Sequence, residues 1–415
     1  MRKNEIRNAA LNIGGECMWG GMSNLVAPAT VLAMLLTEYG ASKSMIGAID
    51  GLTQGLLLLP QIIGIYLFHS RKNRKVRLVL WHVFGVLPFL IIMGFLTFHA
   101  DKLGAKYYRW SMLTCYAFWC FSIGIVVAAW FDFIASLFRT EIRGTVFGLT
   151  HFGSALFGTL GALTAGCALR TYPGTDTYGW LYLIAGPIGM ISMGCWLFVD
   201  EPTEANMSAQ PPAPTFSELK TRFAESLADA NFRNFLISRI LATCGFCVTA
   251  MLAVYFRTSQ GGALTVAFVA QALAAMTFGN ALSAPIIGRI GDRHGHRVAI
   301  ILGNACQMAV FVILLVAPGK WGCVAAYAGA GICLSCNNIS HYNLVLETCP
   351  YENRTIHISF ANLVIGIPLA ITPIIAGFIA EAFGLRIVFT ISFILSLAAL
   401  IWTLFKVKEP RFIVA

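Results

Sequence analysis

The chain has 415 residues, of which 57% are hydrophobic and 12% are charged. Soluble domains carry about 25% charged residues, so this composition excludes a soluble globular protein and indicates a polytopic membrane protein. The formal net charge of +10 does not indicate a nucleic-acid partner, because the basic residues lie in short segments between long apolar runs, as they do in membrane proteins.

Six apolar runs occupy the first 199 residues, and each is long enough to cross a bilayer, which takes about 20 helical residues. The first run follows a basic N-terminal segment and is too long for a cleaved signal peptide, so we expect it to be retained. Backbone groups inside a bilayer must be paired within their own segment, so the spans should be helices. The predicted spans are 11–36, 44–68, 77–98, 109–138, 145–168 and 179–199.

One long polar stretch, residues 200–233, follows the sixth span. Its proline-rich part precedes Thr215 and Glu218, which form a T-x-x-E capping box, and apolar residues at helical spacing predict an amphipathic helix over 216–230 on the inner membrane surface. We therefore divide the chain into an N-terminal six-helix half (1–199), a cytoplasmic linker (200–233) and a C-terminal six-helix half (234–415). The second half holds the predicted spans 234–256, 265–288, 298–317, 322–346, 356–380 and 385–407.

The distribution of basic residues predicts the orientation. With both termini in the cytoplasm, the outer loops hold only eight of the 29 lysines and arginines, and one more, Arg239, lies inside a span. Cytoplasmic loops of membrane proteins carry an excess of Lys and Arg. We expect a multi-pass protein of the plasma (inner) membrane, monomeric in the lipid bilayer, with both termini cytoplasmic.

A charged, glycine-containing segment connects the second and third spans of the second half. It reads Gly288-Arg289-Ile290-Gly291-Asp292-Arg293-His294-Gly295-His296-Arg297, and it predicts a tight cytoplasmic turn. A shift of 224 residues aligns Gly64 with Gly288, but this N-terminal copy has Phe68 and Arg71 at the positions of Asp292 and Gly295.

The pattern G-x-x-G-D-R-x-G-x-R resembles the loop signature of the major facilitator superfamily, and the resemblance covers essentially the whole chain. It implies an all-α polytopic membrane protein with twelve transmembrane helices in two pseudo-symmetric six-helix halves. The strings Leu59-Pro60-Gln61 and Trp130-Phe131-Asp132 are similar to those of a prokaryotic-type branch whose substrate is unassigned. The resemblance also implies that the first, fourth, seventh and tenth helices line a central cavity.

Polar residues inside those four helices are candidates for substrate or proton binding, because ionisable groups are costly in a membrane. In the first interpretation, two carboxylates face one arginine, and the acid without a cationic partner carries protons. In the alternative, Asp132 and Arg239 form a structural pair and Glu16 extends to the membrane surface. A further acid, Asp50, is interpreted as stabilising the start of its own helix. The candidates are Glu16, Asp132, Arg239, Asn337, Asn338 and His341.

The resemblance implies a latch between the halves on the cytoplasmic side. Asp292 is expected near residues 144–147, at the start of the fifth span, with Arg354 as a side-chain partner. The alternative is a plain turn whose charges set the topology. The predicted gating residues are Gly288, Gly291, Asp292, Arg293, Gly295, Arg297, Arg143, Gly144 and Arg354.

The chain contains no Walker A pattern, H-E-x-x-H motif or nucleophile elbow, so we predict neither an enzyme nor a cofactor. The cysteine pairs Cys244/Cys247 and Cys333/Cys336 are interpreted as small packing residues rather than metal ligands. The predicted function is secondary active transport of a small molecule by alternating access, with protons as the favoured coupling ion. A uniporter, a membrane sensor with the same fold and, less favoured, a membrane enzyme stay open as alternatives.

Overall fold

The computed structural model describes residues 3–68, 73–138, 140–201, 221, 224–225, 227–246, 249–348 and 354–409, and these residues form helices joined by short turns, without a strand. The all-α prediction is therefore confirmed. Of the predicted amphipathic helix over 216–230, only residues 221, 224–225 and 227–230 are described, so this prediction stays a prediction.

The N-terminal helices follow the predicted spans, and three of them are interrupted beside a proline. Pro28, Pro60 and Pro88 lie at these interruptions, because proline lacks an N–H group and its ring clashes with the preceding turn. The elements are α1 (Lys3–Leu25), the π-helical turn η1 (Pro28–Leu32), α2 (Ala33–Glu38), α3 (Lys43–Leu58), α4 (Gln61–Leu67), α5 (Arg74–Trp81), the π-helical turn η2 (His82–Val86), α6 (Leu87–Phe98), α7 (Ala100–Leu103), α8 (Ala105–Leu137), α9 (Thr140–Thr171) and α10 (Thr175–Leu197).

The C-terminal helices also match the predicted spans. They are α12 (Ala230–Phe246), α13 (Thr249–Arg257), the short 3-10 turn η4 (Ser259–Gly261), α14 (Val266–His294), α15 (His296–Val316), α16 (Lys320–Thr348), α17 (Arg354–Phe383) and α18 (Leu385–Lys406). Ten helical segments of the described chain are long and apolar enough to cross a membrane. The other two predicted spans are helical as well and are formed by α3 with α4 and by α16.

The turn predicted over 288–297 is much shorter in the structure. Helix α14 continues to His294 and α15 begins at His296, so Gly295 alone connects them, with a φ of +89° that favours glycine. Gly291 lies inside α14, where an added Cβ would come within 2.5 Å of the His296 ring. The predicted length of the turn was wrong. Charged residues and glycines mark the end of an apolar run, but a helix can continue past the end of that run.

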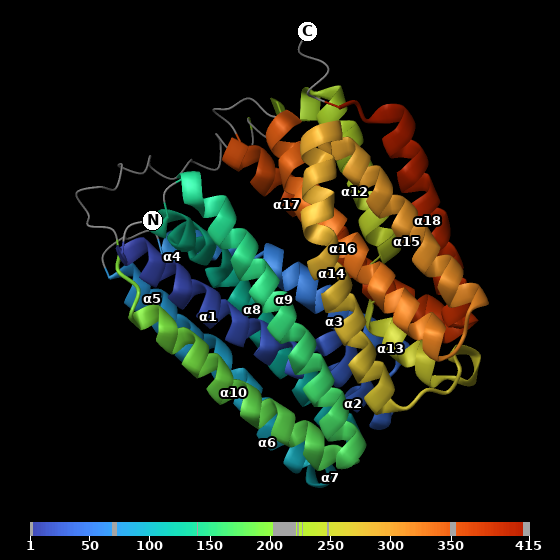
Figure 1. The fold of residues 1–415 in the computed structure, drawn as a ribbon. Helices are drawn as coiled ribbons and strands as arrows, with labels where there is room; N and C mark the ends of the chain where they lie inside the picture. Colours follow the sequence, from blue (N-terminus) through green and yellow to red (C-terminus); the bar gives the residue numbers. More distant parts are fainter. Residues whose placement is uncertain are drawn as a thin grey trace.

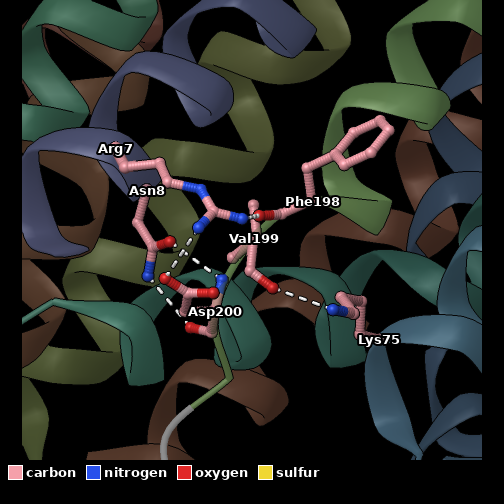
Figure 2. Close-up of polar contacts among 6 residues, drawn as sticks. All are labelled: Arg7, Asn8, Lys75, Phe198, Val199 and Asp200. Carbon is pink, nitrogen blue, oxygen red and sulfur yellow. Dashed lines mark hydrogen bonds and ion pairs between the residues drawn. The ribbon is translucent and has the colours of Figure 1, made fainter.

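Both termini lie at the same end of the molecule (Figure 1), which we call the terminal end, and we call the opposite end the distal end. At the terminal end, α1 is attached to the segment that follows α10 (Figure 2). The Asn8 side chain donates to the Asp200 carbonyl at 3.0 Å and accepts from the Asp200 N–H at 2.9 Å. Arg7 lies 3.4 Å from the Asp200 carboxylate, and Lys75 Nζ donates to the Val199 carbonyl at 2.8 Å.

The same amide arrangement recurs in the C-terminal helices. Asn231, at the start of α12, donates to the Lys408 carbonyl at 3.1 Å and accepts from the Lys408 N–H at 2.8 Å. It thus repeats the pairing of Asn8 with Asp200. This repetition is evidence in the structure for the internal symmetry of the chain.

A glutamate follows each of these amide pairs and binds the first turn of another helix. Glu201 accepts a hydrogen bond from the Lys75 N–H of α5 at 2.6 Å, and Glu409 accepts one from the Arg297 N–H of α15 at 2.9 Å. A carboxylate at a helix N-terminus pairs with unsatisfied N–H groups and with the positive end of the helix dipole. We call the contacts of Asp200 and Glu201 the N-terminal clasp, and those of Lys408 and Glu409 the C-terminal clasp.

The two halves meet along α3 with α17 and along α9 with α14. Small residues permit the close approach: a Cβ on Gly47 would collide with the Pro373 carbonyl oxygen, and one on Gly51 with the Ala370 carbonyl oxygen. Beside them, Lys43 Nζ donates to the Ala380 carbonyl at 2.8 Å. Such close packing of small residues is common between membrane helices.

The polar contacts between described residues of the two halves lie from the middle of the helices to the distal end. The Ala250 N–H of α13 donates to Asp50 Oδ2 at 2.8 Å, and Arg257 lies 3.5 Å from Glu38. Midway along the helices, the hydroxyl groups of Thr159 and Thr277 are 2.8 Å apart. The structure is therefore closed at the distal end.

Candidate functional site

A cavity of about 220 Å³ lies within the N-terminal half, between α1, η2, α8 and α9, with Met193 from α10 at its edge. Polar and aromatic side chains line it together with aliphatic ones. Binding pockets commonly combine an apolar wall with a few convergent polar groups. Its polar and aromatic lining residues are Asn12, Glu16, Trp19, His82, Trp130, Thr150, His151 and Ser154.

Glu16 is the acidic residue of this cavity. Its side chain is half-buried and accepts a hydrogen bond from Trp130 Nε1 at 3.1 Å. Among the described residues, no lysine or arginine forms an ion pair with Glu16. The structure thus places this sequence candidate at a cavity inside the bundle rather than at the membrane surface.

His82 begins the π-helical turn η2, which precedes Pro88. π-Helical turns inside helices are frequently found at functional sites. The imidazole is buried, its Nδ1 lies 2.8 Å from the Leu78 carbonyl, and its ring packs on Trp19 and Trp130 at centroid distances of 5.6 and 4.8 Å. Sequence reasoning did not select His82; the signal that was present is the proline six residues later.

Asn12 lies one helical turn before Glu16, so both side chains are on the same face of α1. Asn12 is fully buried and donates from Nδ2 to Thr150 Oγ1 at 2.7 Å. Its Oδ1 has no hydrogen-bond partner among the described residues. An unsatisfied buried acceptor is costly, which makes Asn12 a functional candidate that the sequence did not indicate.

A second polar contact lies in the C-terminal half. Arg239 of α12 is 7% exposed, and its Nη1 donates to Asn337 Oδ1 of α16 at 2.6 Å. The sequence selected both residues without predicting this contact. The side chains of Asp132, Asn338 and His341 lie outside the described part of the chain, so the predicted Asp132–Arg239 pair stays a prediction.

The predicted gating residues are only partly described. Arg293 is exposed, and the Arg297 guanidinium donates to the Leu404 and Thr403 carbonyls of α18 at 2.7 and 3.4 Å. Gly288 and Gly295 lie at the end of α14 and in the turn after it, as described above. The side chains of Asp292, Arg143 and Arg354 and the surroundings of Gly144 lie outside the described part.

Phe68 occupies the position that corresponds to Asp292 in the first half. It is buried, its ring meets Trp81 edge-on at 5.8 Å, and the Arg77 guanidinium lies 5.7 Å from its ring centre. In the first half this position is therefore a packing contact and not a charged one.

The fold is that of a multi-pass helical membrane protein with a polar cavity inside its N-terminal half. Residues 235–412 match the family described as Major Facilitator Superfamily. A comparison with curated protein sequences finds no match. The C-terminal part of the chain is thus similar in sequence to the major facilitator superfamily.

Solved structures share this fold over nearly the whole chain. A mutant of the nucleoside transporter NupG aligns with a TM-score of 0.70 at 13% identity, covering 98% of this chain and 100% of that one. A bacterial homolog of the human lysosomal transporter Spinster, in an inward-facing and unoccupied conformation, aligns with a TM-score of 0.66 at 13% identity, covering 97% of both chains. At these identities the likeness shows the fold alone.

Proposed function

We propose that the protein is a secondary active transporter that moves a small molecule across the plasma membrane by alternating access, coupled to protons. Its two halves are residues 1–199 and 234–415, joined by a cytoplasmic linker, with both termini in the cytoplasm. The observation that carries the proposal is that the polar contacts between described residues of the two halves lie from mid-helix to the distal end, while the N-terminal half holds a cavity that contains an acid.

Two of these contacts between described residues are simple to separate. Glu38 with Arg257 and Asp50 with Ala250 each join one group of the first half to one of the second, so a rigid rotation of the halves breaks them without disturbing either bundle. Alternating access in transporters with repeated halves is largely such a rocking motion. In the proposed orientation, the distal end faces outward and the structure represents the state closed to the outside.

Distance measurements test this motion. Tyr172 and Trp321 are 69% and 87% exposed at the distal end, one in each half, and accept spectroscopic labels introduced as noncanonical amino acids. We expect two distance populations in lipid nanodiscs, with a ratio that changes between pH 5.5 and pH 8. A single distance under every condition overturns alternating access and favours the sensor.

Glu16 is the proposed proton carrier, with Asp132 as the second candidate. A half-buried carboxylate with one hydrogen-bond donor and no described cationic partner is the kind of group whose protonation responds to its surroundings. Arg239 and Asn337 are proposed substrate contacts from the second half.

Proton movement in proteoliposomes tests the coupling. A pH-sensitive dye is enclosed, and uridine is added first because one structural neighbour is a nucleoside transporter, followed by other small metabolites. We expect a compound that moves protons with the wild type, and loss of that movement in Glu16→Gln or Asp132→Asn. Asp101→Asn removes an exposed carboxylate of α7 and is the control. Transport that ignores an imposed pH gradient favours the uniporter.

A further inference from the structure

The polar atoms around the N-terminal cavity are arranged to accept hydrogen bonds. Glu16 offers a carboxylate, and only Trp130, among the described residues, donates to it. An ionised carboxylate accepts several hydrogen bonds and donates none. On the side of the cavity, Glu16 is therefore a negatively charged hydrogen-bond acceptor.

The orientation of Asn12 follows from its neighbour. Thr150 Oγ1 donates its single hydrogen to the Val146 carbonyl at 2.8 Å, so it can only accept from Asn12, at 2.7 Å. The Asn12 amide must then present Nδ2 to Thr150, which leaves Oδ1 as the acceptor without a donor.

His82 adds a third acceptor. The Leu78 carbonyl cannot donate, so the hydrogen of the 2.8 Å contact belongs to His82 Nδ1. In the neutral ring, Nε2 then carries the lone pair. The Glu16 carboxylate, the Asn12 amide oxygen and the His82 imidazole nitrogen are thus three hydrogen-bond acceptors around one cavity.

Aromatic rings supply the wall of the cavity. Trp19 and Trp130 line it, and both pack on the His82 ring. Cations are attracted to the faces of tryptophan rings, most strongly where water is excluded. The volume of about 220 Å³ is below the roughly 300–1,000 Å³ of sites for drug-sized ligands, so the ligand is small.

We propose that this cavity binds a small organic cation with N–H donors, such as a primary amine on a single aromatic ring. The ammonium group lies against the Glu16 carboxylate, and the ring lies against Trp19 and Trp130. The inference rests on the proposed transport function and names the class of its substrate.

A matched ligand series on the purified full chain tests the proposal. Tyramine, tyrosol and 4-hydroxyphenylacetate share one ring and differ in carrying a positive, a neutral or a negative group. Binding is followed by calorimetry and by quenching of tryptophan fluorescence. We expect tyramine to bind at least about tenfold more tightly than tyrosol, since hydrogen bonds to charged groups exceed neutral ones by about that factor, and the acid not to bind.

Glu16→Gln should remove the preference of tyramine over tyrosol, while Asp101→Asn keeps it. Equal binding of the three compounds, or an unchanged preference in Glu16→Gln, overturns the proposal. The three ligands measured on the unmodified protein test the proposal even if Glu16→Gln does not fold. If another compound is transported and no amine binds, the transport function stands and this inference fails.

Discussion

Asp50 Oδ2 accepts a hydrogen bond from the Ala250 N–H at 2.8 Å, across the boundary between the two halves. Asp50 is 7% exposed in the middle of α3, and Ala250 is the second residue of α13. The carboxylate therefore caps the described start of α13 from the other half of the chain. The interpretation of Asp50 as an acid at the start of its own helix was wrong, because Asp50 lies in the middle of α3 and binds an N–H group of α13.

Removal of the Asp50 carboxylate should open the distal end. Asp50→Asn keeps an acceptor and loses the charge, whereas Asp50→Ala loses both, so we expect the fraction of closed molecules to fall more in Asp50→Ala. The cap is worth about 1–2 kcal/mol. Labels at Tyr172 and Trp321 report the shift.

Thr53→Val is the matched control for Asp50, because Thr53 lies on the same helix and its hydroxyl contacts Tyr116 within the first half, at 2.5 Å. It should leave the distance distribution unchanged. An equal shift in both variants would mean that general destabilisation of α3, and not the cap, opens the structure.

The ion pair of Glu38 and Arg257 should contribute less than Asp50. Its side chains are each 31% exposed and lie 3.5 Å apart, and exposed pairs contribute about 0.2–1 kcal/mol and are weakened by salt. Glu38→Gln should shift the distal distances slightly in low salt and not at all in 1 M salt. A shift that persists in high salt would contradict a screened contact and point to the Tyr178 hydroxyl, which donates to Glu38 at 3.1 Å.

The two clasps should differ in strength although their geometry repeats. Glu409 is 7% exposed, whereas Glu201 is exposed. Burial strengthens a charged hydrogen bond and raises the cost of leaving its donor unpaired. We expect Glu409→Ala to lower the thermal unfolding temperature clearly, by the equivalent of about 1–2 kcal/mol, and Glu201→Ala to lower it less. The reverse order would show that burial does not set the strength of these caps.

The sequence predicted the helices because each span is one long apolar run, and the interruptions at Pro28, Pro60 and Pro88 follow from the chemistry of proline. The contact of Asp50 with the Ala250 N–H has no such signal, because it joins the two halves of the chain. Glu16 was selected as a candidate binding residue because an acidic residue inside an apolar span is costly and therefore rare. Asn12 and His82 were missed because their roles depend on the partners of Thr150 and Leu78, which only the folded structure brings into place.

The contact of Arg239 with Asn337 changes the loss of stability that we expect when the predicted Asp132–Arg239 pair is disrupted. Arg239 donates a hydrogen bond to Asn337 at 2.6 Å, so Arg239 keeps a polar partner when the Asp132 carboxylate is removed. If Asp132 also pairs with it, Asp132→Asn should cost less than the ~3–5 kcal/mol of a stranded buried charge. Asp132→Asn together with Arg239→Gln should then be less destabilised than the sum of the single variants. Additive losses in the double variant would exclude direct or water-bridged contact.

Asp292 lies in the last turn of α14, two residues before its end at His294. A carboxylate is unfavourable there by about 0.3–1 kcal/mol, because the C-terminus of a helix carries negative partial charge. Arg297 is held by the α18 carbonyls in this distally closed state. We therefore predict that Asp292 acts in the other state, in which the terminal ends of the halves approach and residues 144–147 and Arg354 become its partners.

Asp292→Asn tests the latch because it leaves the turn and its arginines in place. The latch predicts a loss of the distally open state by about 1–3 kcal/mol, the usual coupling between two states, together with slower transport. Labels at the terminal tips of α9 and α14 should then show fewer short distances. Arg354→Gln should give the same change, and the double variant little more, since both residues act in one contact. An unchanged distance distribution in Asp292→Asn would leave residues 288–297 as a helix end whose charges set the topology.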